Sequence, residues 1–162
     1  SGSPLMEEDQ TNFEGLKYFP VDPSFKIEAE LTPFQKREII SLKQGDSLEK
    51  KLIKFAKVHF DFNGKACQLT VFKYMNDPLA AAKSDDDELF VPFFDLTSGA
   101  ATYDGGRYIY PTLNSEGKVV LDFNLATNPY CAYNHKYSCV VPPIENSLDF
   151  EVNAGEKSFK AH

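Results

Sequence analysis

The feature that most constrains this chain is the dipeptide Asn63-Gly64, which joins two segments of alternating apolar and polar residues. A two-residue type I′ turn needs positive φ at both central positions, and Asn followed by Gly adopts it readily. The turn therefore fixes the register of an antiparallel hairpin. The expected opposite pairs are Phe62 with Lys65, Phe60 with Cys67, and Val58 with Leu69. This register makes Cys67 a small buried side chain in the core.

Alternation of apolar and polar residues predicts further strands before the turn. Residues 25–32 and 37–42 have the period of half-buried strands, and residues 51–62 form a long strand with an irregularity near Phe55, where we expect a bulge. With 14 Phe, 8 Tyr, 10 Pro, 9 Gly and no Trp, the composition favours aromatic-rich strands joined by turns. The predicted fold class is all-β or mainly β, as an antiparallel β-sandwich or barrel.

The length and charge of the chain limit its organisation and its partners. A chain of 162 residues with 42% hydrophobic side chains can form one domain. We expect residues 1–24 to be an N-terminal arm with a short helix, packed on a single β domain of residues 25–162. The net charge of −7 argues against nucleic-acid binding, and no apolar run is long enough for a transmembrane segment. The start of the chain does not resemble a signal peptide, although a mature exported protein would look the same.

A second hairpin is predicted from GRYIYPTL and KVVLDFN, which flank residues 114–117. The expected core-facing pairs are Tyr108 with Phe123, Tyr110 with Leu121, and Thr112 with Val119. On the opposite face this register brings Arg107 close to Asp122 and Asn124. Such a pair is either a structural ion pair or a binding clamp. The adjacent Gly105 and Gly106 allow a close approach of the backbone.

The remaining segments are assigned from composition. Residues 76–88 are polar and small and predict a loop, and residues 89–96 predict a strand that Pro92 places at an edge or a bulge. Alternation of Leu148, Phe150 and Val152 predicts a final strand. Glu145 and Asn146 precede it, and they either cap the loop or face the same site as Arg107.

Cys131 and Cys139 flank His135 in the segment NPYCAYNHKYSC. A helix would separate the two cysteines by about 12 Å, so a disulfide or a shared metal requires a loop. A closed loop gives a disulfide in an oxidising compartment, whereas reduced thiols with His135 can offer three ligands to zinc. We rank a disulfide or inert thiols above zinc, because no fourth ligand is evident, and we expect no metal and no cofactor. A disulfide would argue for export, so a periplasmic or surface-attached protein is expected ahead of a cytoplasmic one.

A series of motifs extends along nearly the whole chain: SPL, FEGLKYFPVDPSFKIEA, FVPFFDLTSG, YDGGRYI, DFN, NPYCAY, the second cysteine, PPIEN and NAGEK. This series resembles the bacterial and archaeal family known as domain of unknown function 1684. The residues that the family pattern emphasises map here to Gly105, Gly106, Arg107, Asp122, Phe123, Asn124, Cys131, Cys139, Pro142, Pro143, Glu145 and Asn146. His135 is not part of that pattern, which weakens the zinc alternative. Members occur with and without export signals, so the resemblance leaves the compartment open.

Two functions of different classes follow. The first is a non-catalytic binding module for a small polar or anionic ligand or for a protein partner. Its candidate ligand-binding residues are Gly105, Gly106, Arg107, Asp122, Asn124, Tyr133, Glu145 and Asn146. The alternative is a hydrolase-like or other enzyme that uses Asp122 or Glu145 as general acid or base, with Arg107 holding an anionic group of the substrate. No GxSxG, P-loop or HExxH motif occurs, and we prefer binding, with the catalytic residues unassigned.

Overall fold

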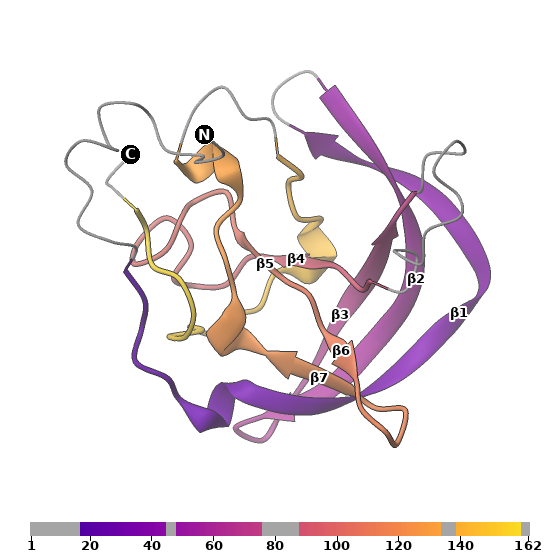
Figure 1. The fold of residues 1–162 in the computed structure, drawn as a ribbon, viewed down its shortest axis with the longest axis horizontal. Coiled ribbons are helices and arrows are strands. Elements are labelled where there is room, and N and C mark those ends of the chain that lie inside the picture. The colour runs from indigo at the N-terminus through magenta and orange to yellow at the C-terminus, as the bar shows by residue number, and fades with distance from the viewer. Residues whose placement is uncertain (1–16, 45–47, 76–87, 134–138, 160–162) are drawn as a thin grey trace.

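The computed structural model describes residues 17–44, 48–75, 88–133 and 139–159. The strands in these ranges are β1 (Lys26–Gln44), β2 (Leu48–Phe62), β3 (Lys65–Tyr74), β4 (Val91–Phe93), β5 (Arg107–Ile109), β6 (Thr112–Leu113) and β7 (Val119–Asp122). The helical elements are single 3-10 turns: η1 (Pro23–Phe25), η4 (Phe123–Leu125), η5 (Tyr130–Ala132) and η6 (Ile144–Asn146). The described part of the chain is thus mainly β, as predicted, and its strands curve around a common core (Figure 1).

The hairpin of β2 and β3 has the predicted register. Asn63 and Gly64 have φ of 50° and 79°, the positive values that a type I′ turn requires. The pairs Phe62 with Lys65, Phe60 with Cys67, and Val58 with Leu69 are all confirmed. The register shifts between Lys54 and Ala56, so the bulge expected near Phe55 is also confirmed.

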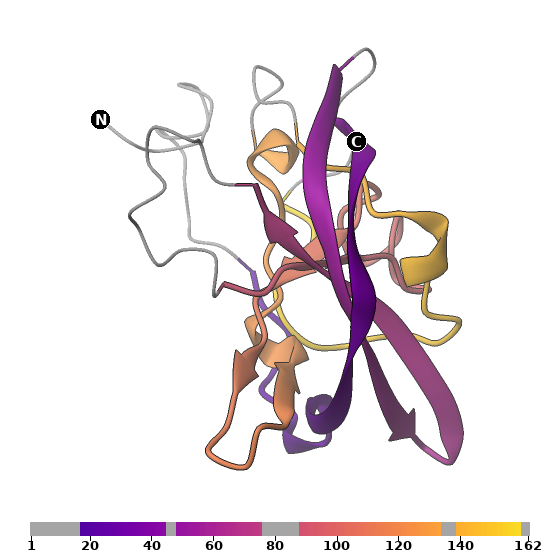
Figure 2. The ribbon, with the colours of Figure 1, turned by 90° about the vertical axis from the view of Figure 1, so that its right-hand side faces the viewer.

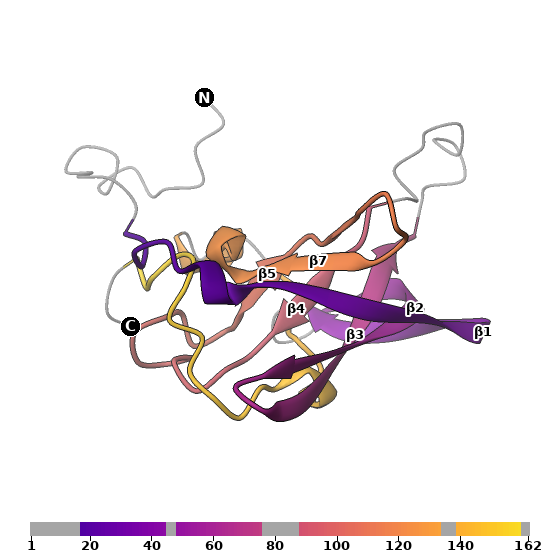
Figure 3. The same ribbon diagram turned by 90° about the horizontal axis from the view of Figure 1, so that it is seen from below.

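The strands follow one another around an incompletely closed barrel. The first sheet has the order β3-β2-β1-β7-β6, and β4 pairs with β5 in a second. Strand β1 is the central strand of the first sheet and joins its two halves, because residues 26–29 pair with β7 and residues 30–33 and 38–44 pair with β2. Reciprocal backbone hydrogen bonds of 2.8 Å between Phe72 and Phe90 join β3 to β4. Figures 2 and 3 show the long β1 curving past both β2 and β7.

The core lies inside this curve and is rich in phenylalanine. Val58, Leu69, Phe93 and Phe123 are fully or almost fully buried in the main cluster, and the rings of Phe93 and Phe123 meet edge to face at 5.3 Å. A second cluster around Phe72, Phe90 and Tyr108 fills the end where β3 meets β4. Burial of these side chains is the main source of stability that the sequence pattern provides.

The predicted register of the second hairpin is wrong by one residue and the hairpin is shorter than expected. Thr112 lies opposite Val120, not Val119. The cause is the turn, in which Asn114 Oδ1 accepts from the N–H groups of Glu116 and Lys118 and Gly117 adopts φ of 79°. These interactions stabilise a longer connection than the one we assumed, and a shift of one residue exchanges the two faces of a strand.

Tyr108 is not opposite Phe123, because β5 leaves the hairpin and pairs with β4. Its partners are Pro92 in β4 and Thr127 beyond η4. Pro111 stands between β5 and β6 and has no N–H to donate, which marks the point where the chain changes partner. The predicted placement of Arg107 opposite Asn124 and diagonal to Asp122 depended on the longer hairpin and is therefore wrong, and the carboxylate that Arg107 contacts is that of Asp95.

Two other predicted strands differ from the structure. The segment 89–96 contains only the short strand β4, because Phe94 turns to form a bridge with Ser147. Residues 148–152 form no regular strand, although Leu148 and Val152 are buried as their alternation suggests. This segment is held by backbone hydrogen bonds of Leu148 and Phe150 with residues 94 and 96 and by the Asp95 side chain, which accepts from the Val152 N–H.

The described part of the N-terminal arm contacts the C-terminal segment. Tyr18 forms a bridge with Glu156, and the Phe19 N–H donates to the Gly155 carbonyl at 2.9 Å. The predicted N-terminal helix and nearly all of the predicted loop at 76–88 lie outside the described residues. In the part of the chain that the structure describes, no helix has the length and apolar character that crossing a membrane requires.

Candidate functional site

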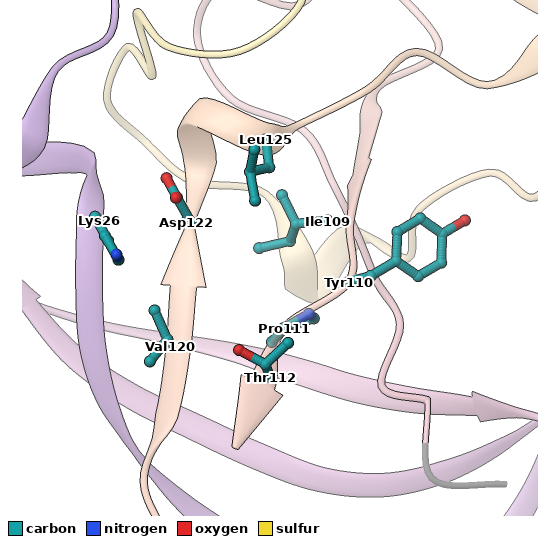
Figure 4. Close-up of a pocket in the computed structure, with 8 residues that line it drawn as sticks. All are labelled: Lys26, Ile109, Tyr110, Pro111, Thr112, Val120, Asp122 and Leu125. Atoms are coloured by element: carbon teal, nitrogen blue, oxygen red, sulfur yellow. The ribbon is translucent and has the colours of Figure 1, made fainter. Parts of the chain in front are cut away.

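An open cleft lies where β1, β7, η4 and the connection from β5 to β6 meet (Figure 4). It has a volume of about 190 Å³. We call it the Lys26 cleft, and it is lined by Lys26, Ile109, Tyr110, Pro111, Thr112, Val120, Asp122 and Leu125. The cleft is the place where the chain leaves regular pairing, since Pro111 interrupts one wall and η4 follows β7 directly.

Local hydrogen bonds shape the rim of the Lys26 cleft. Asp122 caps η4, because its Oδ1 accepts from the Asn124 N–H at 3.1 Å and from the Asn124 side-chain amide at 3.0 Å. Asn124 in turn exchanges hydrogen bonds with the backbone of Asp22 in the arm, each 2.9 Å long. Asn124 therefore holds the arm beside β7, and the turn leaves Leu125 71% exposed at the rim.

Lys26 and Asp122 give the cleft a polar end. They are directly opposite each other in the antiparallel pair of β1 and β7. The Lys26 ammonium forms no ion pair within 4.0 Å with any described residue, and no described residue donates to Asp122 Oδ2. The walls formed by Ile109, Pro111 and Leu125 are apolar. The cleft thus combines an available cation, an available carboxylate oxygen and an apolar surface.

Arg107 lies in a different place, inside a buried polar cluster. We call it the Arg107 cluster, and its members are Asp95, Arg107, Asn128, Tyr133 and Glu156, none of them more than 8% exposed. The Arg107 side chain has no exposed surface, and its Nη2 lies 3.4 Å from Asp95 Oδ1. Arg107 also donates to the carbonyls of Val152 at 3.0 Å, Ala154, and Glu156 at 3.2 Å. Arg107 therefore ties the C-terminal segment to β5 and offers no surface to a ligand in this structure.

Asp95 and Glu156 complete the Arg107 cluster. Asp95 Oδ2 accepts from the Val152 N–H at 2.7 Å and the Thr97 hydroxyl at 2.8 Å. Glu156 accepts from the Asn128 N–H at 2.9 Å and from the Tyr133 hydroxyl. Burial raises the pKa of Glu156 above its ordinary value of 4.5, although the nearby Arg107 opposes the shift. Tyr133, predicted as a ligand contact, is thus a buried hydrogen-bond donor within the protein.

Gly106 is required by packing inside the protein, and Gly105 packs against the Tyr103 ring. A Cβ atom on Gly106 would lie 2.7 Å from the Phe93 carbonyl oxygen, and the residue has φ of 86°. A Cβ on Gly105 would lie 2.4 Å from the Tyr103 ring. Gly106 therefore lets the chain pass closely over β4 on its way into β5.

The Asn146 side chain links β3 to the segment of β4. Its side chain accepts from the Thr70 N–H at 2.8 Å and donates to the carbonyls of Thr70 and Pro92, each at 2.9 Å. It is fully buried. Its neighbour Glu145 is exposed, accepts from the Thr70 hydroxyl, and lies 3.9 Å from the Lys54 ammonium. Of the two alternatives for this pair, the Asn146 contacts match the structural one.

Cys131 and Cys139 approach each other, as predicted, and are unbonded thiols in this structure. The Cys131 N–H donates to the Cys139 sulfur at 3.2 Å, and the Tyr103 hydroxyl donates to the Cys131 sulfur at 3.5 Å. His135, the third ligand of the zinc alternative, lies outside the described residues. Cys67 packs against the main core but is only half-buried, so the expected full burial is wrong.

The structure does not bring the predicted site residues to one pocket. Of the eight candidates, Asp122 is the one that lines the Lys26 cleft, while Arg107, Tyr133 and Asn146 are buried. Sequence reasoning missed Asp95 and Glu156, although both lie within motifs that carry the family resemblance. It also missed two residues of the cleft: Lys26, which lies within the motif FEGLKYFPVDPSFKIEA, and Tyr110, which directly follows the motif YDGGRYI.

The fold and these contacts define a small antiparallel β domain that is closed by an arginine-centred polar cluster and has an open cleft on one side. The family described as protein of unknown function (DUF1684) matches residues 11–157, so the chain belongs to this family. The solution NMR structure of an uncharacterized protein of Haloarcula marismortui is similar, with 36% identity and a TM-score of 0.77. That match covers 99% of this chain and 85% of the other. No curated protein matches the chain.

Proposed function

We propose that the chain is a non-catalytic binding module that holds a small molecule in the Lys26 cleft. The observation that supports this proposal is the position of Lys26 and Asp122. They lie opposite each other on the neighbouring strands β1 and β7, and they form no ion pair with each other. The Lys26 ammonium and Asp122 Oδ2 have no partner among the described residues, so they suit a ligand that accepts a hydrogen bond from the ammonium and donates one to the carboxylate.

The shape of the cleft narrows the class of ligand. Its volume of about 190 Å³ is below the ~300–1,000 Å³ of sites for drug-sized molecules. Ile109, Pro111 and Leu125 line the apolar part of the cleft, whereas the Tyr110 ring points away from Lys26 and Asp122 (Figure 4). A hydroxy acid with a small aromatic or aliphatic body matches both parts. Its carboxylate would accept from Lys26, and its hydroxyl would donate to Asp122.

Binding is favoured over catalysis by the role of Asp122. One of its carboxylate oxygens caps η4 and holds Asn124, and Asn124 holds the arm. A carboxylate fixed in this way is well placed to orient a ligand. Arg107, the anion clamp of the enzyme alternative, is engaged inside the Arg107 cluster.

The test uses three small hydroxy acids, lactate, mandelate and phenyllactate, titrated into the isotope-labelled protein and followed by amide chemical shifts. We expect phenyllactate to shift the amides around the cleft most. Lys26→Met should weaken its binding by about 10-fold or more, because a hydrogen bond to a charged group contributes about 1.5–3 kcal/mol. Lys43→Met is the matched control, since Lys43 is an exposed lysine at the other end of β1.

Two results would contradict the proposal. One is that none of the three acids shifts the amides around the cleft at millimolar concentration. The other is that Lys43→Met weakens binding as much as Lys26→Met, which would indicate a general charge effect and no defined site.

A further inference from the structure

Cys131, Cys139 and Tyr103 form a small cluster that takes no part in the Lys26 cleft. Cys131 lies in η5, and Tyr103 precedes the glycine turn that leads into β5. All three residues are half-buried, so none of them is fully shielded from solvent. The Cys139 sulfur lies 3.2 Å from the Cys131 backbone nitrogen, which places it beside the Cys131 side chain.

Two donors converge on the Cys131 sulfur. The Tyr103 hydroxyl donates to it at 3.5 Å, and the Cys139 thiol also gives it a hydrogen bond. The hydrogen bond from Cys139, followed by that from Tyr103, lowers the pKa of Cys131 to about 6, against the opposing effects of burial and of Asp104. The same interaction with Cys131 raises the pKa of Cys139. The two thiols are therefore unequal.

Cys67 shows that this arrangement is specific to the pair. Its sulfur is also half-buried, but it donates to the Lys65 carbonyl at 3.4 Å, and no described hydroxyl or thiol donates to it. Burial raises the pKa of Cys67. The surroundings of Cys131 thus favour its thiolate, whereas those of Cys67, a residue of similar exposure, disfavour it.

We propose that Cys131 and Cys139 form a thiol–disulfide exchange site for small disulfides, in which Cys131 is the attacking thiol and Cys139 the resolving thiol. Donors that stabilise a thiolate, together with a second sulfur within reach, are the two requirements of such a site. This inference is independent of ligand binding in the Lys26 cleft.

The reaction has two steps. The Cys131 thiolate attacks one sulfur of a disulfide RSSR, so a bond from Cys131 to SR forms, the S–S bond of the reagent breaks, and RS⁻ leaves and takes a proton from water. Cys139 then loses its proton to water and attacks the Cys131 sulfur, forming the Cys131–Cys139 bond and releasing the second RS⁻. Two protein thiols are oxidised to one disulfide, while RSSR is reduced to two molecules of RSH.

The hydrogen bond between the two thiols also orders these steps. While Cys131 is a thiolate, it holds the proton of Cys139 and keeps Cys139 unreactive. Once Cys131 carries the SR group, that negative charge is gone and Cys139 can ionise. Tyr103 acts as a positioning residue, because its hydroxyl stabilises the thiolate without touching the reagent.

The experiment exposes the full chain to glutathione disulfide at pH 6 and follows the products by intact mass and peptide mapping. Wild type should lose two hydrogen atoms and keep Cys67 free. Cys139→Ser should accumulate one glutathione on Cys131, because the resolving thiol is missing. Cys131→Ser should react at least about 20-fold more slowly, since the larger thiolate fraction of Cys131 at this pH outweighs its lower intrinsic nucleophilicity.

Cys67→Ser is the matched control and should behave as wild type. Peptide mapping of wild type gives the order of reaction without any substitution, so the test does not depend on the folding of a variant. The proposal is overturned if Cys67 is modified as fast as Cys131, or if wild type collects glutathione without forming the Cys131–Cys139 disulfide.

A second readout separates positioning by Tyr103 from simple packing. In wild type the reaction rate should be half-maximal near pH 6, the pKa of Cys131. Tyr103→Phe keeps the ring and removes the donor, so its half-maximal pH should move upward. An unchanged pH profile in Tyr103→Phe would show that the hydroxyl does not stabilise the thiolate.

Discussion

The Arg107 cluster and the Lys26 cleft contain similar chemical groups in opposite situations. Each has a cation beside carboxylate oxygen. In the Arg107 cluster the guanidinium contacts Asp95 and three carbonyls, and no part of it is exposed. In the cleft Lys26 has no ion-pair partner among the described residues and faces solvent. The difference teaches that Arg107, a charged residue of the family pattern, maintains the fold, whereas Asp122 of the same pattern lies in the open cleft beside Lys26.

The largest expected effect is on the buried side of this comparison. Arg107→Met should lower the free energy of unfolding by about 3–5 kcal/mol, because it leaves Asp95 and Glu156 buried without their cation. Urea unfolding of both proteins measures the difference. A loss below about 1 kcal/mol would mean that the cluster tolerates an uncompensated carboxylate. Arg107 would then be no more important for stability than Lys26 is expected to be.

Asn146→Ala tests whether a second family residue is structural. The substitution leaves the Thr70 N–H and two carbonyls buried without partners, and each unsatisfied group costs about 1–3 kcal/mol when it cannot reach water. We expect a total loss of about 2–4 kcal/mol in urea unfolding. Asn153→Ala is the control at an exposed position and should stay within about 0.5 kcal/mol of wild type.

Glu156 should make the Arg107 cluster sensitive to pH. The folded carboxyl has a pKa above 4.5, so it binds a proton more tightly than the unfolded one does. Its contribution to stability is therefore fully present below pH 4.5 and is lost as the pH rises through the folded pKa. Compared with Glu156→Gln, wild type should gain stability as the pH falls from 7 to 4.5. A difference between the two proteins that is constant over this range would contradict the raised pKa.

The smallest expected effect is at the cleft. Lys26→Met should change the free energy of unfolding by no more than about 0.5 kcal/mol, because the ammonium forms no ion pair with any residue that the structure describes. A destabilisation comparable to that of Arg107→Met would show that Lys26 is a structural residue as well. The comparison between a closed and an open polar region would then no longer hold.

The first half of the fold could be predicted because its information is local. Asn63 and Gly64 determine a turn by their own backbone preferences, and the turn determines which residues of β2 and β3 face each other. The bulge at Phe55 follows from the break in alternation. Nothing distant in the sequence is needed to place these residues.

The site could not be predicted because its contacts are distant and not periodic. Arg107 finds its partners in Asp95 and in carbonyls of residues 152–156, and carbonyl acceptors leave no signal in the sequence. Lys26 meets Asp122 through the pairing of β1 with β7, which no turn determines. Asn114 explains the error in the register of the second hairpin, because its side-chain hydrogen bonds stabilise a longer turn than the one we predicted.

The three carbonyls that hold Arg107 have a consequence for how the protein is made. A ribosome releases the chain from its N-terminal end, so the hairpin of β2 and β3 can form as soon as residue 74 has emerged. Arg107 emerges much earlier than residues 152–156, and until then its guanidinium must remain in water. Synthesis interrupted before residue 152 should therefore leave a chain with one formed hairpin and an open second half, which is a substrate for proteases. The fold closes around β5 only when this late segment arrives.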